Sequence, residues 1–250
     1  PYPVPLGRGQ YPESAKFRQL LLREAKLRDP DAPTRRLEKI IEALGGAFYL
    51  GVIDVRLAGR FFQFQRGEIV GGESFVDYIQ FPDKERTEFG DDGDIIRINN
   101  GVQGWNVSDD DVTEQIPEQI DLFWEEFKVG LDYLLRYSVN DPNTTIQYLG
   151  REIIDFKRAD ILEIRDDDRT RITLYIERET GLLMKKTVRR LDDPVVYEDV
   201  YSNYHEFEDV LTPLLINRYS DGLKTMEIRF EEVTYNSGLS DLMFLEPSRR

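Results

Sequence analysis

The sequence predicts an α+β protein that is mostly β, built on one large curved antiparallel sheet with about three covering helices. About ten short segments between residues 53 and 235 show strand-like patterning, with turn residues between them at hairpin spacing. Three further segments place apolar residues at helical spacing. Antiparallel strands usually bury one face, and a sheet of this size must curl, split or close. We therefore expect the sheet to curl beneath the helices.

The first helical segments follow a short tail. Residues 1–12 are rich in Pro and Gly, which predicts an extended tail ahead of a single domain over 13–250. A first helix is predicted over about 13–28. A second helix has Pro33 in its first turn and ends at Gly45-Gly46. The apolar face of this second helix consists of Leu37, Ile40, Ile41 and Leu44.

The strands fall into two runs that a long helix separates. In the first run, over about 53–107, the alternation shifts phase at Phe61-Phe62, which indicates a bulge or bend. The helix is predicted from Pro117 to about Tyr137, on the order of 30 Å long, with cap-type residues at 108–111 before it. The second run is typical of a β-meander, with strands at about 145–149, 158–165, 170–178, 182–190, 195–207, 213–219 and 223–235.

The composition excludes several classes of protein. The 250 residues include no cysteine and one histidine, which excludes thiol nucleophiles, cysteine-ligated metals and sites built on two histidines of this chain. A formal net charge of −15 argues against a nucleic-acid partner, because phosphate binding needs a surplus of Lys and Arg. No run of 18 apolar residues is present, so we expect no transmembrane segment. We also expect no cofactor and no metal site.

The charge is distributed unevenly along the chain. Residues 1–80 carry 12 Lys and Arg against 10 Asp and Glu, a net charge of +2. Residues 81–250 carry 21 against 38, a net charge of −17. The basic side chains centre on the first two predicted helices. We favour a solvated helix face that docks on an acidic body, and the alternative is a docking surface for an acidic partner or an anionic head group.

Catalytic signatures are absent from the sequence, which has no GxSxG, SxxK or P-loop motif. His205 is a candidate general base or metal ligand, with Glu206 or Asp209 beside it. We favour a histidine that is hydrogen-bonded within a sheet or exposed at its edge, because a lone histidine lacks its usual orienting partners. Acidic clusters at 91–94, 109–111 and 166–168 suit calcium in composition, but turns and caps explain them better. We therefore expect no enzymatic activity.

The remaining candidate site is apolar. Side chains from one face of several strands, together with the stripe of the long helix, are candidates to line a concave cavity. On the pattern alone, an ordinary hydrophobic core explains the same residues better. The candidate ligand-binding residues are Phe62, Phe64, Phe75, Tyr78, Phe127, Leu131, Leu134, Ile172, Leu174, Ile176, Met226, Ile228 and Phe230.

Several short motifs follow one another in order over residues 37–247. They are Glu42-Ala43-Leu44-Gly45-Gly46, then Phe81-Pro82-Asp83-Lys84-Glu85-Arg86, then Asn100-Gly101 and Gly104-Trp105. The end of the chain fits V-x-x-N-x-x-[IL]-x-D-x-x-F-x-x-P with Val233, Asn236, Leu239, Asp241, Phe244 and Pro247. Taken in this order, the motifs resemble the LolA/LolB-like group of exported carriers, also described as outer-membrane lipoprotein-sorting proteins.

The resemblance implies a half-open β-barrel that holds an apolar cavity beneath helices. It implies export to the periplasm or the cell envelope, with the signal segment lying before Pro1, and it implies no enzymatic activity. We therefore expect a carrier or binding protein that shelters a lipid, an acyl chain or a lipoprotein. The alternative is an envelope interaction or sensing module on the same fold, with a closed cavity and an envelope protein as its partner.

Overall fold

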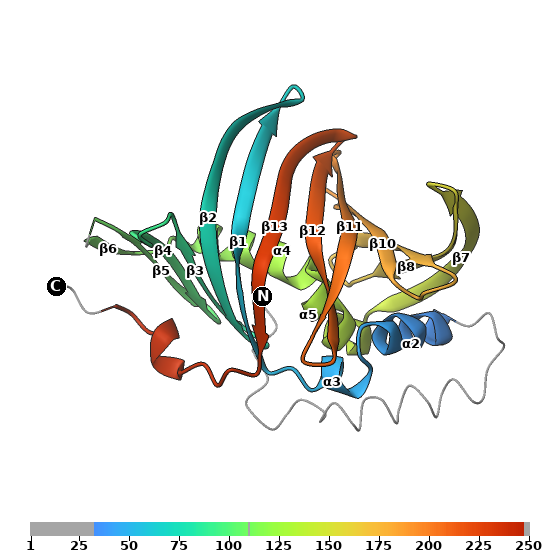
Figure 1. Ribbon diagram of the computed structural model, residues 1–250, viewed down its shortest axis with the longest axis horizontal. Coiled ribbons are helices and arrows are strands. Elements are labelled where there is room, and N and C mark those ends of the chain that lie inside the picture. Colours follow the sequence, from blue (N-terminus) through green and yellow to red (C-terminus); the bar gives the residue numbers. More distant parts are fainter. Residues whose placement is uncertain (1–32, 110, 248–250) are drawn as a thin grey trace.

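The computed structural model describes residues 33–109 and 111–247, which form a curved sheet with helices packed against it (Figure 1). Thirteen strands make one antiparallel sheet in the order β6-β5-β4-β3-β2-β1-β13-β12-β11-β10-β9-β8-β7. β1 and β13 pair at its centre, and β6 and β7 lie at its two ends. The sheet is therefore curved and not closed, which confirms the predicted fold class. The predicted tail over 1–12 and helix over 13–28 lie outside the described residues.

The strands match the predicted meander closely in position. They are β1 (Asp54–Gln65), β2 (Glu68–Gln80), β3 (Lys84–Phe89), β4 (Ile95–Asn100), β5 (Gln103–Ser108), β6 (Asp111–Glu114), β7 (Thr145–Ile154), β8 (Lys157–Arg165), β9 (Arg171–Glu177), β10 (Leu183–Arg189), β11 (Val196–Phe207), β12 (Val210–Ser220) and β13 (Leu223–Tyr235). The strands follow the alternation of apolar and polar residues in the sequence. In β9, for example, Ile172, Leu174 and Ile176 are buried and the residues between them are partly exposed.

The phase shift predicted at Phe61-Phe62 is displaced in the structure. The pairing of β1 with β13 shifts register between Ala58 and Gly59, and the pairing with β2 shifts between Gln63 and Phe64. Gly59 explains the first position, because a Cβ there would lie 2.1 Å from the carbonyl oxygen of Arg229. Only glycine lets the two strands approach so closely, so the bend is set at this residue.

The helices are short. They are α2 (Pro33–Ala43), α3 (Ala47–Leu50), α4 (Pro117–Val129) and α5 (Leu131–Arg136), with single-turn 3-10 helices η1 (Ser138–Asn140) and η2 (Asp241–Phe244). α2 confirms the second predicted helix. In the described part of the chain, no helix is both long and apolar enough to cross a membrane.

The predicted single helix from Pro117 to Tyr137 is two helices. Gly130 leaves the helical conformation, with φ −56° and ψ 140°, and separates α4 from α5. The amide of Gly130 still donates to the Glu126 carbonyl at 3.1 Å, so α4 ends in a hydrogen-bonded turn. Apolar spacing continues across the break because both helices pack toward the sheet, which is why the periodicity alone predicted one helix.

The predicted cap of this helix is also wrong. Asp111 begins strand β6 instead of preceding the helix. The N-cap is Ile116, whose amide donates to the side-chain oxygen of Gln119 at 3.1 Å, and Pro117 occupies the first turn as predicted. Of the described acidic residues, Asp109 therefore lies in the turn after β5, and Asp111 lies in β6.

The main core lies where α2, α3 and α5 pack on β8–β12. The largest side chains that are almost fully buried in it are Leu37, Ile40, Ile41, Leu44, Leu134, Leu135, Leu162, Ile164, Leu174 and Ile176. The guanidinium of Arg36 in α2 lies 3.7 Å from the Asp160 carboxylate and 3.8 Å from the centre of the Tyr148 ring. α2 thus contacts an acidic side chain of the sheet through a buried arginine, and not through the solvated basic face that the charge distribution predicts. A second, smaller core at the β6 end surrounds Phe244 of η2.

Candidate functional site: a cavity beneath helix α4

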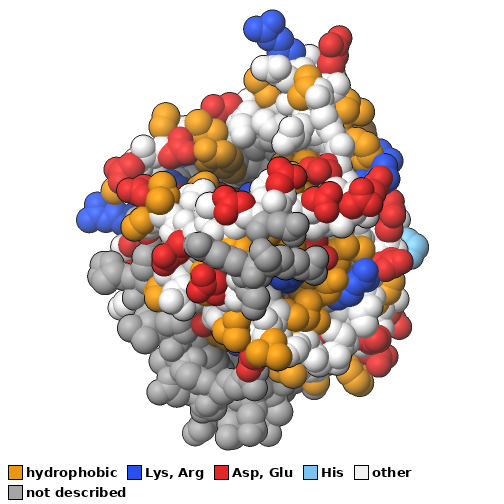
Figure 2. All heavy atoms as spheres, turned by 90° about the vertical axis from the view of Figure 1, so that its left-hand side faces the viewer, with side chains coloured by type: hydrophobic (Ala, Val, Ile, Leu, Met, Phe, Trp, Pro, Cys, Tyr) orange, Lys and Arg blue, Asp and Glu red, His pale blue; other side chains and the backbone are white. Residues whose placement is uncertain are grey.

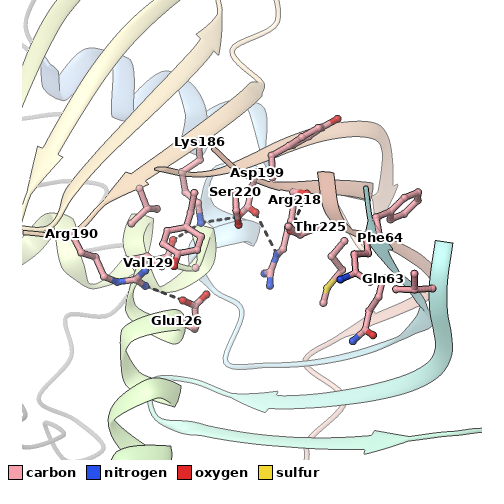
Figure 3. Close-up of a pocket in the computed structure, with 17 residues that line it drawn as sticks. Gln63, Phe64, Glu126, Val129, Lys186, Arg190, Asp199, Arg218, Ser220 and Thr225 are labelled. Carbon is pink, nitrogen blue, oxygen red and sulfur yellow. Dashed lines mark hydrogen bonds and ion pairs between the residues drawn. The ribbon is translucent and has the colours of Figure 1, made fainter. Parts of the chain in front are cut away.

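A cavity of about 630 Å³ opens between the concave face of the central strands and the end of α4 (Figure 3). Its volume suits a small organic ligand. The apolar part of its lining includes Val129, Val188, Tyr197 and Met226. The charged part of its lining consists of Glu126, Lys186, Arg190, Asp199 and Arg218. The lining is therefore part apolar and part charged, whereas the resemblance implies an apolar cavity.

Three charged residues form a row across adjacent strands on the floor of the cavity. Register pairs Lys186 of β10 with Asp199 of β11, and Asp199 with Arg218 of β12. The Lys186 Nζ atom lies 3.1 Å from one carboxylate oxygen of Asp199, and the Arg218 Nε atom lies 3.3 Å from the other (Figure 3). Burial alone would raise the pKa of the Asp199 carboxyl, but Lys186 and Arg218 outweigh it and hold that pKa below its usual range. The row therefore carries two positive charges against one negative charge.

A second ion pair ties α4 to the sheet. Arg190, just after β10, donates to the Glu126 carboxylate at 2.9 Å, and its guanidinium lies 5.4 Å from the centre of the Tyr197 ring. Lys186 makes a further link, since its ammonium donates to the Val129 carbonyl at the last residue of α4, at 2.7 Å. The roof of the cavity is therefore held to its floor by two cations of the same strand segment.

Aromatic side chains continue the concave face beyond the cavity. At the cavity, Gln63 of β1 pairs with Met226 of β13. Two residues further along each strand, Phe61 pairs with Ile228 on the same face. The Phe61 ring centre lies 6.2 Å from that of Phe75, and Phe75 lies 5.9 Å from Phe230. Phe61, Ile228 and Phe230 are only partly buried. An apolar strip thus leads away from the charged row.

Two acidic side chains also occupy the concave face, Asp77 on β2 and Glu85 on β3. Burial raises the pKa of Asp77 to about 6, although the hydrogen bond with Thr87 and the charges of Arg97 and Arg218 oppose the rise. Burial, followed by the charge of Asp77, raises the pKa of Glu85 to about 8. The pair therefore retains one proton near neutral pH, chiefly on Glu85, while Asp77 is mostly ionised. The Oδ1 atom of Asp77 is buried without a hydrogen-bond partner.

The structure divides the sequence-predicted site residues among several places. Phe64 and Met226 border the cavity, and Phe75, Ile228 and Phe230 lie on the strip beside it. Phe127 packs within an aromatic cluster that includes Phe81 and Tyr133. The main core contains Leu134, Ile172, Leu174 and Ile176, with Leu131 packed against it. Phe62 stacks under Arg229, and Tyr78 packs on the second core. Whether any of these residues binds a ligand stays a prediction.

His205 is exposed, and its Nε2 atom lies 3.1 Å from the Asn203 side-chain oxygen. An exposed histidine beside a side chain of its own strand fits the interpretation of a histidine hydrogen-bonded within a sheet better than a catalytic one. Asp166 accepts the amide of Thr170 at 2.7 Å, and Asp91 accepts the hydroxyl of Ser74 at 2.6 Å, so both serve as local hydrogen-bond acceptors. Among residues 33–109 and 111–247, no group of three His, Asp or Glu side chains is arranged to hold a metal ion.

Sequence reasoning missed the charged row. Its signal is present, because Lys186 is two residues before the buried Val188, and Asp199 stands between Tyr197 and Tyr201 on one strand face. A charged residue in the inward phase of a strand marks either an ion pair or a polar site. The pairing of three such residues across three strands needs the register, which only the structure supplies.

No protein-family model and no curated protein sequence matches this chain. Solved structures do match it along most of its length. A DUF1329 family protein from Desulfovibrio piger ATCC 29098 superposes with a TM-score of 0.61 at 14% identity, covering 84% of this chain and 96% of that chain. A putative outer membrane lipoprotein-sorting protein domain from Vibrio parahaemolyticus gives 0.60 at 13% identity, covering 85% and 97%. The LolA superfamily protein NE2245 from Nitrosomonas europaea gives 0.57 at 13%, covering 84% and 96%.

At these identities the likeness shows the fold alone. The chain has a LolA-like fold, which confirms the resemblance that the ordered motifs predict.

Proposed function

We propose that this protein is a non-enzymatic binding protein or carrier that shelters an amphiphilic ligand in the cavity beneath α4. The observation that carries this proposal is the cavity itself, about 630 Å³ of space beside an apolar strip on the concave face of an open sheet. Surfaces of this kind that stay partly uncovered usually mark a binding site. The LolA-like fold and the printed description of one neighbour as a putative lipoprotein-sorting domain support the same ligand class.

The setting that we propose is the periplasm or the cell envelope. The neighbours described as outer membrane lipoprotein-sorting and LolA superfamily proteins support it. A carrier in that compartment needs to hide an acyl chain from water, and the curved sheet offers a concave surface for that purpose. Binding without chemistry agrees with the polar groups around the cavity, which pair with one another as Lys186 with Asp199 and Arg190 with Glu126.

Titration with a dansyl-labelled fatty acid, together with native mass spectrometry of the purified protein, tests this function. We expect saturable binding with one site. The variant Met226→Trp places an indole in the cavity and should weaken binding by about tenfold or more, because overpacking a filled site costs about 1–3 kcal/mol. Leu223→Trp adds the same group at the exposed start of β13 and should bind like the parent protein. Equal binding by both variants would place the ligand elsewhere, and no binding at all would remove the carrier function.

A second candidate function, recognition of an envelope protein, is favoured by one observation. The turn between β7 and β8 exposes Phe156 completely, and Ile153 beside it is 73% exposed. Exposed apolar groups at a sheet edge suit a protein partner. Cross-linking of envelope extract tests it: cross-links that centre on this turn and disappear in Phe156→Ser would favour the interaction module, provided that the fatty acid does not bind.

A further inference from the structure

We propose that Arg218 binds the oxyanionic head group of the amphiphile, a carboxylate or a phosphate, while the chain lies on the apolar strip. This inference rests on the proposed function and names the ligand class of the same cavity. It attributes the selectivity for anionic over neutral amphiphiles to the side chain of Arg218.

The guanidinium of Arg218 has N–H donors that do not face Asp199. Its Nε atom faces Asp199 at 3.3 Å, and in the described part of the chain no other carboxylate lies within ion-pair distance of its guanidinium. Figure 3 shows the terminal nitrogens directed into the cavity, away from Asp199. The side chain is 44% exposed. A guanidinium carries five N–H donors in a planar fork, and the free edge matches the two oxygens of a carboxylate or phosphate.

The other two cations of the cavity lining are engaged in ion pairs within the protein. Lys186 is 4% exposed and divides its donors between Asp199 and the Val129 carbonyl. Arg190 pairs with Glu126 on α4 and lies over the Tyr197 ring. The surplus positive charge of the lining therefore resides on Arg218.

This surplus contrasts with the rest of the molecule. The lining has three cations and two carboxylates, a net charge of +1, in a chain whose net charge is −15. Figure 2 shows acidic side chains spread over much of one outer face, with few basic ones among them. The acidic outer surface therefore repels an anionic ligand, and the positively charged cavity lining attracts it. This difference directs an anion to the cavity in preference to other parts of the protein.

The acidic pair on β2 and β3 weakens this attraction less than two free carboxylates would. Asp77 and Glu85 face Arg218 across the concave surface, but burial raises the pKa of both carboxyls, so the pair carries about one negative charge instead of two near neutral pH. Asp77 also faces Arg97 and bonds to Thr87. Glu126, the remaining carboxylate near Arg218, is paired with Arg190.

The chain of such a ligand has a continuous path. Arg218 pairs in register with Met226, and Ile228 lies two residues further along β13, opposite Phe61 of β1. Phe61 leads on to Phe75 and Phe230. A head group at Arg218 therefore places the acyl chain over partly exposed apolar side chains, where burial of its methylene groups is favourable.

The test compares three probes that share one chain: oleate, oleoyl lysophosphatidate and oleyl alcohol. We expect the parent protein to bind the two anions at least about tenfold more tightly than the alcohol, as fits a charge-assisted hydrogen-bond pair. Arg218→Gln should abolish this preference and leave the affinity for the alcohol unchanged. Arg218→Lys should keep part of the preference, because it keeps the charge and loses the fork.

Arg229→Gln is the matched control, because Arg229 lies on β13 but outside the cavity lining, paired with Glu227. It should retain the preference, and circular dichroism should show that all variants are folded. Preference for oleate alone, or for the lysophosphatidate alone, tells which oxyanion is the natural head group. The inference is overturned if the alcohol binds the parent protein as well as the anions do, or if Arg218→Gln keeps the preference. Failure of all three probes to bind contradicts the proposed function as well.

Discussion

The Lys186 ammonium lies 3.1 Å from the Asp199 carboxylate and 2.7 Å from the Val129 carbonyl. One nearly buried cation thus connects two strands of the sheet to the last residue of α4, immediately before the break at Gly130. The carbonyls at a helix end need donors, and Lys186 supplies one from the cavity floor. The position of α4 over the cavity therefore depends on a charged side chain of the sheet.

Replacing Lys186 by Met should destabilise the protein. The substitution leaves the Val129 carbonyl without its donor and leaves Asp199 with Arg218 alone. We expect a loss of about 1–3 kcal/mol in the free energy of unfolding, the usual cost of a buried polar group left unsatisfied. Urea unfolding followed by circular dichroism measures it.

Lys185→Met is the control for this prediction. Lys185 is the neighbouring residue, points to the other face of β10, and pairs with Glu198 at 3.1 Å with 23% of its side chain exposed. A pair exposed in this way contributes about 0–1 kcal/mol. If the two variants lose the same free energy of unfolding, the contact of Lys186 with α4 does not stabilise the protein more than the pair of Lys185 with Glu198 does.

The acidic pair predicts an unusual dependence of stability on pH. The pKa of Glu85 is raised from its ordinary 4.5 to about 8 by burial and by Asp77. The folded protein therefore binds more protons than the unfolded chain within this window, and the free energy of unfolding falls as pH rises through it. The contribution is complete below pH 4.5 and is lost as the pH approaches 8.

Glu85→Gln should flatten this decline and make the protein more stable than the parent at pH 8. Glu68→Gln, at the exposed start of β2, should leave the pH profile of the parent intact. Urea titrations across the window supply the measurement. A parent protein whose stability rises between pH 4.5 and pH 8 would contradict the raised pKa of Glu85.

Gly59 should tolerate no side chain. A Cβ at this residue would lie 2.1 Å from the Arg229 carbonyl oxygen, so the Gly59→Ala variant has to separate β1 from β13 at the centre of the sheet. We expect a loss of more than about 2 kcal/mol, as for other overpacked buried sites. In Gly71→Ala the nearest atom is the flexible end of Gln63 at 3.4 Å, and thermal unfolding should show little change. Equal melting temperatures for the two variants would disprove the close approach.

Local periodicity predicted most of this fold, and the failures have physical causes. The alternation of Ile172, Leu174 and Ile176 defines a strand without help from other residues. The break at Gly130 escaped prediction because apolar spacing runs through it, although an isolated glycine in a helical pattern was a usable signal. The acidic run before the helix was misassigned because cap residues and strand-turn residues are the same types.

The candidate site was less predictable than the fold. Apolar candidates such as Leu134 and Leu174 belong to the core, since periodicity finds buried faces and does not tell a filled face from an open one. The row of Lys186, Asp199 and Arg218 depends on the register of three successive strands, β10, β11 and β12. A shift of one residue in a pairing turns every side chain of that strand to the other face, and the alternation of each strand alone does not fix which charged residues lie opposite one another.

Hydrogen–deuterium exchange with and without oleate tests the central claim most directly, because it locates the ligand on the fold. A ligand beneath α4 should slow amide exchange at the end of α4, in β10 and β11 near Lys186 and Asp199, and in β12 and β13 near Arg218 and Met226. The β7–β8 turn at Phe156 should exchange as it does in the free protein. Protection confined to that turn, or no protection anywhere at saturating oleate, would contradict a ligand site in the cavity.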